Sequence, residues 1–334
     1  MHDDRRSPAA PGPGAGRAAA RLPLSRAALD RDDARRREPE LLERLLADPD
    51  TRILLQHRDT ALTDRTDAHH EGVPAALDLR TLAHLPPHTG PLYLGRLIAD
   101  RTNPGGRVDP AGTAIVAIEI GDFEAGELEP DQLRWAQLRE VAVDLDDVDA
   151  GLFTQALALR NFHRAYRYSP TTGEALEAVD AGWVLRGRDG ERSVFPRTDT
   201  AVIVLVLDDT GRALLGANVN WRPRRFSLLA GFVEPGESFE QAAAREVLEE
   251  GGARIVDPEY YGSQPWPFPA SLMVGFTARL DPGQHPDEVE PDGTEIAEVR
   301  WFTRDELRER PELLPGRASI ARSMIDDWLE GRID

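Results

Sequence analysis

Two residue types are missing from the 334-residue chain, and each absence excludes a class of chemistry. Without cysteine, the protein can form no disulfide, use no thiol nucleophile and hold no zinc through thiolates. Without lysine, since all 40 basic residues are arginine, it can have no catalytic lysine and form no Schiff base. Tryptophan is present but scarce, with 6 residues, so a Trp fixed between prolines requires an explanation.

Long apolar runs are also missing, and the acidic charge is in large excess. No run is long enough to span a bilayer, and the first 20 residues lack the apolar stretch of a signal peptide. We therefore expect residues 1–20 to be a disordered tail, no membrane association and a cytoplasmic protein. A net charge of −19 argues against a general nucleic-acid-binding surface, so action on a polyanion would need a local basic loop or metal ions.

The rest of the chain predicts a mixed α/β protein, α+β overall, with about two domains. A helical signal at 40–47 and strand-like runs at 91–97 and 113–120 predict a small N-terminal α+β domain over residues 21–150. Residues 151–197 begin in a helix predicted over 148–166 and continue as a connector without periodicity.

Residues 198–334 predict a second domain, in which strands alternate with two or three helices. The expected strands are residues 201–207, 212–217, 272–280 and 296–302. The expected helices are residues 238–250, with a capping box of Ser238 and Gln241, a short one capped by Thr303 and Glu306, and 318–329.

The helix over 238–250 carries three carboxylates on one face. Glu246, Glu249 and Glu250 are spaced i, i+3, i+4, and such close like charges weaken a bare helix. A hard divalent cation with oxygen ligands, Mg²⁺ or Mn²⁺, would remove that conflict, and Arg245 is placed to orient Glu249. Taken alone, the run "REVLEE" is equally typical of a solvated helix face.

The residues around this helix resemble the Nudix box, G-x5-E-x7-R-E-U-x-E-E-x-G-U. The matching positions are Gly231, Glu237, Arg245, Glu246, Glu249, Glu250 and Gly252. Ala253 is the one departure, and it affects packing rather than chemistry. The resemblance implies a Nudix hydrolase, with an α/β/α sandwich that hydrolyses a diphosphate bond through bound metal. It implies Glu246, Glu249 and Glu250 as metal ligands and Glu237 as a support of the loop; it does not assign the general base.

A second stretch, "SQPWPFP" at residues 263–269, points to a subfamily. Its prolines exclude a helix or a central strand and indicate a stiff, extended segment that displays Trp266 and Phe268. The stretch resembles the marker of NADH pyrophosphatases, and "FPRTD" and "EVRWF" agree with it. That resemblance implies cleavage of NAD(H) into nicotinamide mononucleotide and AMP, by a homodimer. Bacterial members also remove NAD caps from RNA.

The same resemblance implies a set of substrate positions. Phe232 and Trp266 are expected to stack on the bound base, with Trp266 reaching the partner's site. The other pocket positions are Gln264, Ile203, Ala321 and Phe195. Glu295 matches a further metal carboxylate, with Glu298 as the alternative. Core packing is the alternative for Phe232 and Ile203, and a solvated loop charge is the alternative for Glu295.

The chain departs from the subfamily where a four-cysteine zinc ribbon is usual. Ser169, Thr172, Gly187 and Gly190 stand where the thiolates would be, and they cannot hold structural zinc. We therefore predict no bound zinc and a degenerate ribbon. Ala270 replaces the usual Gln after the marker, which leaves room for a different substrate.

Three further readings stay open. The enzyme could prefer another nucleoside diphosphate derivative, such as ADP-ribose. A non-catalytic nucleotide sensor is the rival outside enzymes, although a sensor has no need of every box carboxylate. The basic stretch "WRPRRF" offers Arg224 and Arg225 as phosphate contacts, and a solvated loop is equally compatible with it.

Overall fold

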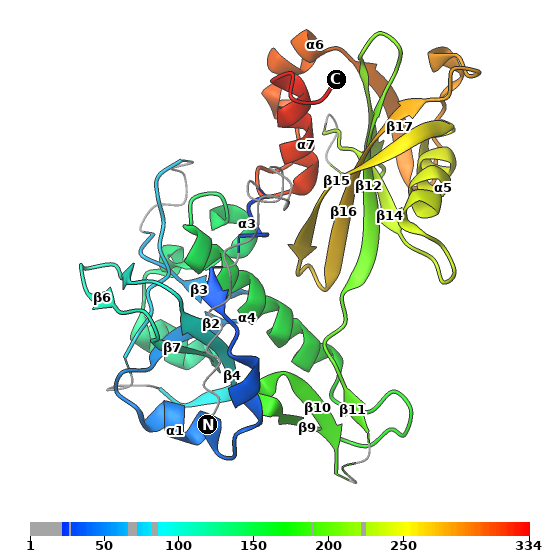
Figure 1. The fold of residues 1–334 in the computed structure, drawn as a ribbon. Coiled ribbons are helices and arrows are strands. Elements are labelled where there is room, and N and C mark those ends of the chain that lie inside the picture. The colour runs from blue at the N-terminus through cyan, green and yellow to red at the C-terminus, as the bar shows by residue number, and fades with distance from the viewer. Residues whose placement is uncertain are drawn as a thin grey trace, which may run out of the picture. The chain divides into compact units, whose positions relative to one another are not determined.

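The structure is a computed structural model that describes residues 22–26, 28–65, 72–81, 86–188, 190, 192–221 and 225–334. The predicted tail and Arg224 lie outside these residues. The described chain forms two compact units, each with its own sheet and core (Figure 1). Unit 1 contains residues 26–197 and 267–270, and unit 2 contains residues 22–25, 198–266 and 271–334.

Unit 1 is built on a six-stranded mixed sheet in the order β1-β4-β7-β2-β3-β8. The strands are β1 (Leu29–Asp30), β2 (Arg52–His57), β3 (Thr60–Leu62), β4 (His88–Leu97), β7 (Ala114–Ile120) and β8 (Trp135–Gln137). A separate pair consists of β5 (Arg101–Thr102) and β6 (Val108–Asp109). The strands β2 and β7 pair in parallel, and both are almost continuously buried because their apolar residues face layers on both sides.

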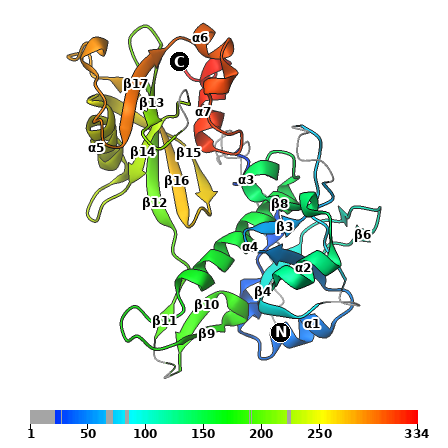
Figure 2. The ribbon, with the colours of Figure 1, turned by 180° about the vertical axis from the view of Figure 1, so that it is seen from behind.

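The helices of unit 1 pack around this sheet (Figure 2). They are α1 (Leu41–Ala47), α2 (Asp122–Leu128), α3 (Leu138–Val141), α4 (Asp147–Ala165) and the 3₁₀ turns η2 (Asp33–Arg37) and η4 (Gln132–Arg134). The α+β class, the first helix, the long helix and the two strand runs are therefore confirmed. Strand β2 was not predicted, because "RILLQH" is too short to show a period that separates strand from helix.

The stretch predicted as a connector contains a small antiparallel sheet in the order β11-β10-β9. Its elements are β9 (Leu176–Val179), η5 (Asp180–Gly182), β10 (Val184–Gly187) and β11 (Ser193–Val194). Turns closed by hydrogen bonds lie where the zinc ligands would be: Thr172 N donates to Ser169 Oγ at 3.3 Å, and Gly190 N donates to Gly187 O at 3.0 Å. The sequence predicted a degenerate ribbon here but not its individual strands, because strands of two to four residues are too short to show periodicity.

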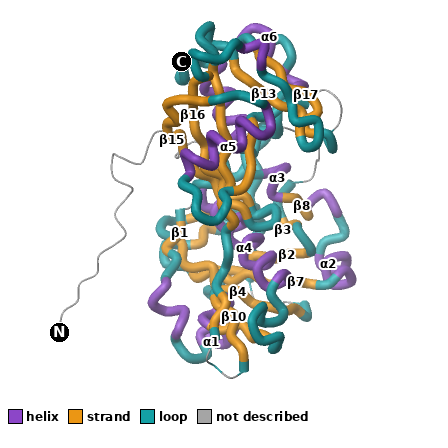
Figure 3. Tube along the Cα trace, turned by 90° about the vertical axis from the view of Figure 1, so that its right-hand side faces the viewer, coloured by secondary structure: helices purple, strands orange, loops and turns teal. Residues whose placement is uncertain are grey.

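Unit 2 is an α/β/α sandwich, as predicted. Its sheet has the order β15-β16-β12-β13-β17, and β14 also pairs with β12. The strands are β12 (Asp199–Leu207), β13 (Ala213–Asn218), β14 (Leu229–Phe232), β15 (Ile255–Trp266), β16 (Ser271–Leu280) and β17 (Ile296–Phe302). The helices are α5 (Phe239–Gly251), η6 (Pro286–Glu288), α6 (Arg304–Arg308), η7 (Pro311–Leu313) and α7 (Ile320–Leu329). Figure 3 shows α5 in purple beside the strands in orange.

The alternation of β12 explains the two faces of this sheet. Val202, Val204 and Val206 pack in the core cluster that contains Ala243 and Val247 of α5. The intervening residues Ile203, Leu205 and Leu207 pack in the second cluster, with α7. Because successive side chains of a strand point to opposite faces, the apolar run "AVIVLVL" fills both layers. We call these the α5 face and the α7 face; α5 and α7 lie on opposite sides of the sheet in Figure 1.

The predicted helix caps are present. Ser238 Oγ accepts a hydrogen bond from Gln241 N, Gln241 Oε1 accepts one from Ser238 N, and Gly252 ends the helix at φ 64°. Thr303 and Glu306 form the second predicted capping box. In the described part of the chain, no helix has both the length and the apolarity needed to cross a membrane.

The "SQPWPFP" stretch is only half extended. Residues Ser263–Trp266 form the end of β15, which is an edge strand and pairs with β16. Because an edge strand has a neighbour on one side, the missing N–H of Pro265 leaves no gap in a second hydrogen-bond ladder. Residues 267–270 then turn, with a cis bond between Phe268 and Pro269. The expectation of one extended segment over seven residues was therefore wrong in its second half.

Candidate active site

The site begins where β14 passes the middle of α5. An ideal Cβ placed on Gly231 would lie 2.1 Å from the carboxyl carbon of Glu246 and 2.2 Å from each of its oxygens. No other residue type could occupy this position without displacing that carboxylate. The box glycine is thus required for close approach, and the pairing of Gly231 with Glu246 in the box pattern has a steric reason.

Arg245 holds the box carboxylates together. Its Nε and Nη2 donate to both oxygens of Glu237 at 2.6 and 2.8 Å. Its Nη1 donates to Glu246 and to Glu249, each at 2.9 Å, and Nη2 also reaches the carbonyl oxygen of Phe232 at 2.9 Å. The hydrogen bond from Arg245 lowers the pKa of Glu237 to about 2, and the carboxylates raise that of Arg245. This fork geometry ties the start of the loop to the helix face, which a point charge could not do.

Glu250 is the carboxylate that Arg245 does not reach. It is 7% exposed, and one of its oxygens accepts a hydrogen bond from Ala230 N at 3.0 Å. Burial raises its pKa to about 7, and the charges of Glu246, Glu295 and Asp292 add to the shift. Burial likewise raises the pKa of Glu246, with contributions from Glu249 and Glu295. The site therefore holds mutually repelling carboxylates in a partly desolvated place.

Glu295, the predicted further carboxylate, lies close enough to raise the pKa of both Glu246 and Glu250. Its loop is fixed by Asp292, whose oxygens accept hydrogen bonds from Glu295 N at 3.0 Å and Ile296 N at 2.8 Å. Hydrogen bonds, first that of Thr294, lower the pKa of Asp292 to about 2. Asp292 was missed from the sequence, although "DGTE" has the form of an Asx turn that would have suggested it. Glu298, the alternative, lines a cavity between β17 and β13 instead.

These residues have the donor chemistry that a hard divalent cation prefers. All the donors are carboxylate oxygens, and within the described residues the buried Glu250 accepts its hydrogen bond from a backbone N–H rather than from a cationic side chain. Side chains of His, Asp and Glu in the described residues do not already converge in threes to form a closed metal site. The match between this site and a divalent cation thus depends on the carboxylate donors and on the repulsion among Glu246, Glu250 and Glu295, which a cation would remove.

The predicted substrate residues of unit 2 share the α7 face. Phe232 is 59% exposed, whereas Ile203 and Ala321 are buried in the core cluster that contains α7. Gln264 is fully buried: its Nε2 donates to Ala318 O at 3.0 Å, and its Oε1 accepts from Ile320 N at 2.7 Å. Because both ends of that amide are engaged, Gln264 fixes the start of α7.

The two remaining aromatic candidates are placed differently. Trp266 follows Gln264 by two residues in β15, so it emerges on the same face, and it is partly buried. Phe195 is 63% exposed and belongs to unit 1. Residues 267–270 also belong to unit 1, where Asn161 Nδ2 donates to Pro267 O at 2.9 Å and Arg139 lies 4.0 Å above the Phe268 ring.

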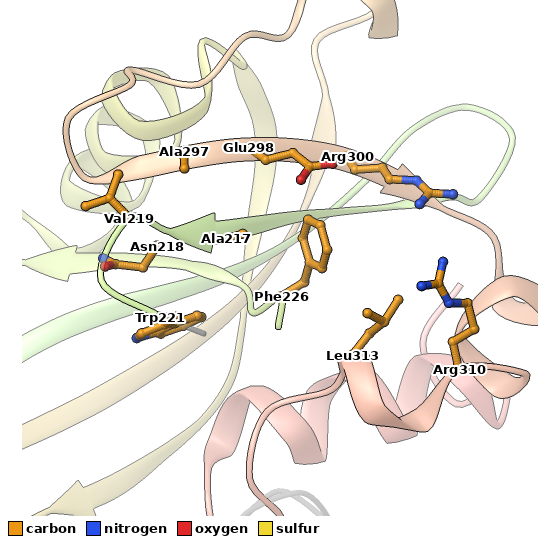
Figure 4. Close-up of a pocket in the computed structure, with 10 residues that line it drawn as sticks. All are labelled: Ala217, Asn218, Val219, Trp221, Phe226, Ala297, Glu298, Arg300, Arg310 and Leu313. Atoms are coloured by element: carbon orange, nitrogen blue, oxygen red, sulfur yellow. The ribbon is translucent and has the colours of Figure 1, made fainter. Parts of the chain in front are cut away.

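A cavity of about 400 Å³ opens on the α7 face next to Glu295 (Figure 4). Its apolar wall comes from β13, Phe226 and η7, and its polar groups come from the end of β13, from β17 and from Arg310, which precedes η7. Val219 in that turn donates its N–H to Glu295 O at 2.9 Å. No sequence motif indicated this cavity, because it is assembled from four separate segments.

The chain matches two family profiles. The NUDIX domain matches residues 197–325, and the NADH pyrophosphatase-like rudimentary NUDIX domain matches residues 46–161. Together they cover more than half of the chain, and both agree with the resemblance found in the sequence.

Two curated relatives carry names of the same kind. The NAD-capped RNA hydrolase NudC of Mycobacterium bovis is 46% identical over 203 residues, which cover 57% of this chain and 64% of that protein. The NAD-capped RNA hydrolase NUDT12 of Homo sapiens is 33% identical over 205 residues, which cover 56% and 43%. The chain thus spans less than two thirds of the length of these relatives.

Among solved structures, a NUDIX hydrolase from Nitrosomonas europaea is similar at a TM-score of 0.42 and 23% identity, covering 50% of this chain and 92% of that one. The family assignment depends on the two profiles and on the box residues that the structure gathers around Gly231. The chain is a member of the Nudix superfamily, with a NADH pyrophosphatase-like rudimentary NUDIX domain followed by a NUDIX domain.

Proposed function

We propose that this protein hydrolyses the diphosphate bond of NAD(H), releasing nicotinamide mononucleotide and AMP, and that it removes NAD caps from RNA by the same reaction. The observation that carries the reaction class is the cluster of Glu246, Glu250 and Glu295 beside Gly231, in which Arg245 pairs with Glu246 but does not reach the buried Glu250. The substrate class is supported by the "SQPWPFP" marker and by relatives named NAD-capped RNA hydrolases.

Each residue of the chain has a stated task in this proposal. Glu246, Glu249, Glu250 and Glu295 would hold Mg²⁺ or Mn²⁺, which when bound neutralises the diphosphate and polarises phosphorus for in-line attack by water. Arg245 and Glu237 hold the loop and the helix face in register. Before the cation binds, Glu250 must lose the proton that its raised pKa retains near neutrality.

Phe232 and Trp266 are assigned to stacking on the bound base, and Ile203, Ala321, Gln264 and Phe195 to the surroundings of that base. Exposure of Phe232 supports a stacking role over core packing. Gln264 acts through its two backbone partners, because neither end of its amide is left for a ligand. The proposal retains a homodimer in which Trp266 reaches the partner's site, a cytoplasmic location without membrane association, and the domain limits 21–150, 151–197 and 198–334.

One panel assay tests the function. The protein is incubated with Mg²⁺ or Mn²⁺ and NADH, NAD⁺, ADP-ribose, diadenosine polyphosphates or NAD-capped RNA, and the products are separated. We expect nicotinamide mononucleotide and AMP, formed faster from NAD derivatives than from ADP-ribose. Faster turnover of ADP-ribose would overturn the substrate class, and tight binding without turnover of any member would identify a sensor.

Zinc provides a separate test. The hydrogen-bonded turns at Ser169–Thr172 and Gly187–Gly190 contain no thiolate, so we expect no zinc after a chelator wash. Stoichiometric zinc in elemental analysis would contradict this expectation.

A further inference from the structure

The 400 Å³ cavity on the α7 face has no task in the reaction described above. Its volume falls in the range of roughly 300–1,000 Å³ that is typical of small-molecule sites. We infer that it binds the adenosine half of the substrate and places a 3′-phosphate between Arg300 and Arg310, so that the enzyme distinguishes NAD linked to RNA from free NAD. This inference rests on the proposed function.

The cavity is connected to the carboxylate cluster by its own wall. Asn218 is the register partner of Ile296, and Val219 N donates to Glu295 O at 2.9 Å. The turn that forms one end of the cavity is therefore hydrogen-bonded to the residue that raises the pKa of Glu246 and Glu250. Asn218 and Val219 thus place this end of the cavity beside the loop that carries Glu295.

The same end carries an aromatic ring. Trp221 is 47% exposed and is held by a turn in which its N–H donates to Asn218 O at 3.0 Å. Ala217, Phe226 and Leu313 supply the apolar wall beyond it. An exposed indole above an apolar wall is suited to stacking with a purine base, because every base presents a π-face.

The opposite end is cationic. Figure 4 shows the guanidinium groups of Arg300 and Arg310 at the end away from Trp221, with Glu298 on the strand between them. Arg300 Nη2 donates to Glu306 at 2.8 Å, and Arg310 Nε lies 3.5 Å from Glu312. Arg300 also lies 4.5 Å over the Phe302 ring, and each arginine has one carboxylate partner. These contacts leave several of the five N–H donors of each guanidinium for another acceptor, such as a phosphate.

The order of these features along the cavity defines the ligand. From the carboxylates outward come an aromatic platform, a carboxylate suited to accept a hydrogen bond from a sugar hydroxyl or a base amine, and two arginines. An adenosine with a diphosphate at its 5′ end and a phosphate at its 3′ end presents complementary groups in the same order. Free NAD lacks the 3′-phosphate, and the first linkage of a capped RNA provides it.

Binding without turnover tests the inference directly. The full chain in EDTA is titrated with AMP and with adenosine 3′,5′-bisphosphate in a calorimeter. We expect the bisphosphate to bind about 10-fold more tightly, in line with a charge-assisted hydrogen bond at a partly exposed site. Arg300→Gln and Arg310→Gln should each remove most of that advantage and leave AMP binding within about twofold. Trp221→Ala should weaken both ligands alike, by roughly 5- to 20-fold.

Arg254→Gln is the matched control, because Arg254 is half exposed, pairs with Asp281 at 3.6 Å and does not line the cavity. Thermal melting of each variant verifies folding. In turnover assays the Arg300 and Arg310 variants should hydrolyse NAD-capped RNA about 10-fold more slowly, and their hydrolysis of NADH, which lacks a 3′-phosphate, should not slow. The slope of log affinity for the capped RNA against log salt concentration should become smaller by about 0.7 for each lost phosphate contact.

Equal binding of AMP and the bisphosphate by the wild type, or an advantage that survives both arginine substitutions, overturns the inference. If no diphosphate is turned over but the bisphosphate advantage depends on Arg300 and Arg310, the proposed function fails and the site remains.

Discussion

Each unit contains a buried carboxylate, and the two are treated in opposite ways. Asp149 of unit 1 is 1% exposed, and Arg101 neutralises it through Nε at 2.6 Å and Nη2 at 2.8 Å. Leu77 N donates to it as well, at 2.8 Å. Glu250 of unit 2 is 7% exposed and receives one backbone hydrogen bond, from Ala230.

This difference in charge neutralisation suggests different roles: a structural one for Asp149 and, in the proposed function, a catalytic one for Glu250. Burial raises the pKa of Asp149, but the hydrogen bonds and charge of Arg101 oppose that shift. For Glu250 the neighbouring charges are all negative, so they reinforce the effect of burial. The proposed function accounts for this contrast: Asp149 is neutralised within the fold, whereas Glu250 would receive its counter-charge from a bound cation.

The largest effect is expected in unit 1. Asp149→Asn keeps the shape but removes the closest counter-charge of the buried Arg101 and leaves it, among the described residues, only the ion pair with Asp109 at 3.8 Å, which should cost about 3–5 kcal/mol of unfolding free energy. Hydrogen exchange of peptides from α4, measured on the full chain, reports this loss in unit 1. Asp147→Asn is the control two residues away, because its carboxylate is 61% exposed and its pair with Arg26 is a surface pair worth less than about 1 kcal/mol. Equal losses in the two variants would show that Asp149 is not the essential partner.

The corresponding change in unit 2 should affect activity and spare the fold. Glu250→Gln retains an acceptor for Ala230 N and removes a charge from the cluster, so unfolding free energy without metal should not fall. Turnover of NADH should fall by roughly 10²–10³-fold, the usual effect of removing one preorganised electrostatic group. Product formation and melting in EDTA, measured side by side, test both halves. Destabilisation like that of Asp149→Asn would remove the contrast between the two carboxylates.

The sequence predicted elements best where local signals were strong. The caps at Ser238 and Thr303 and the run at 201–207 each specify structure by themselves, and all three are confirmed. Strand β14 was not predicted, since its four residues are ordered by pairing with β12. The second half of "SQPWPFP" was predicted as extended, because proline biases alone do not determine where a hairpin turns.

The candidate site was likewise predictable from the sequence only in part. The box carboxylates and Glu295 are expected from spacing and resemblance, but their differing environments depend on tertiary burial. The i, i+4 spacing of Arg245 and Glu249 predicts their contact, and the structure confirms it, but no spacing shows that Glu250 is buried. The cavity at Trp221 combines residues from segments up to about ninety positions apart, so only the fold reveals it.

A smaller effect is expected from the group that organises the box. Arg245→Lys keeps the positive charge and loses the fork that joins Glu237, Glu246 and Glu249. We expect a 10- to 100-fold loss in metal affinity or turnover, the usual range for groups that orient ligands. Calorimetric titration with Mn²⁺ measures the affinity, and Arg254→Lys serves as control. Unchanged affinity would mean that charge alone suffices, as it would for a solvated helix face.

The smallest effect is a pH dependence that belongs to Glu250. Its pKa rises on folding from 4.5 to about 7, so between these values the folded state binds more protons than the unfolded state. Stability contributed by this group therefore falls as pH rises from about 4.5 to 7. Since other carboxylates titrate there too, the measured quantity is the melting temperature of Glu250→Gln minus that of the wild type, in EDTA. This difference should grow between pH 5 and pH 8 and shrink when Mg²⁺ is added, because the cation replaces the proton. A difference that stays constant with pH would place Glu250 with Asp149, as a carboxylate already satisfied by the fold.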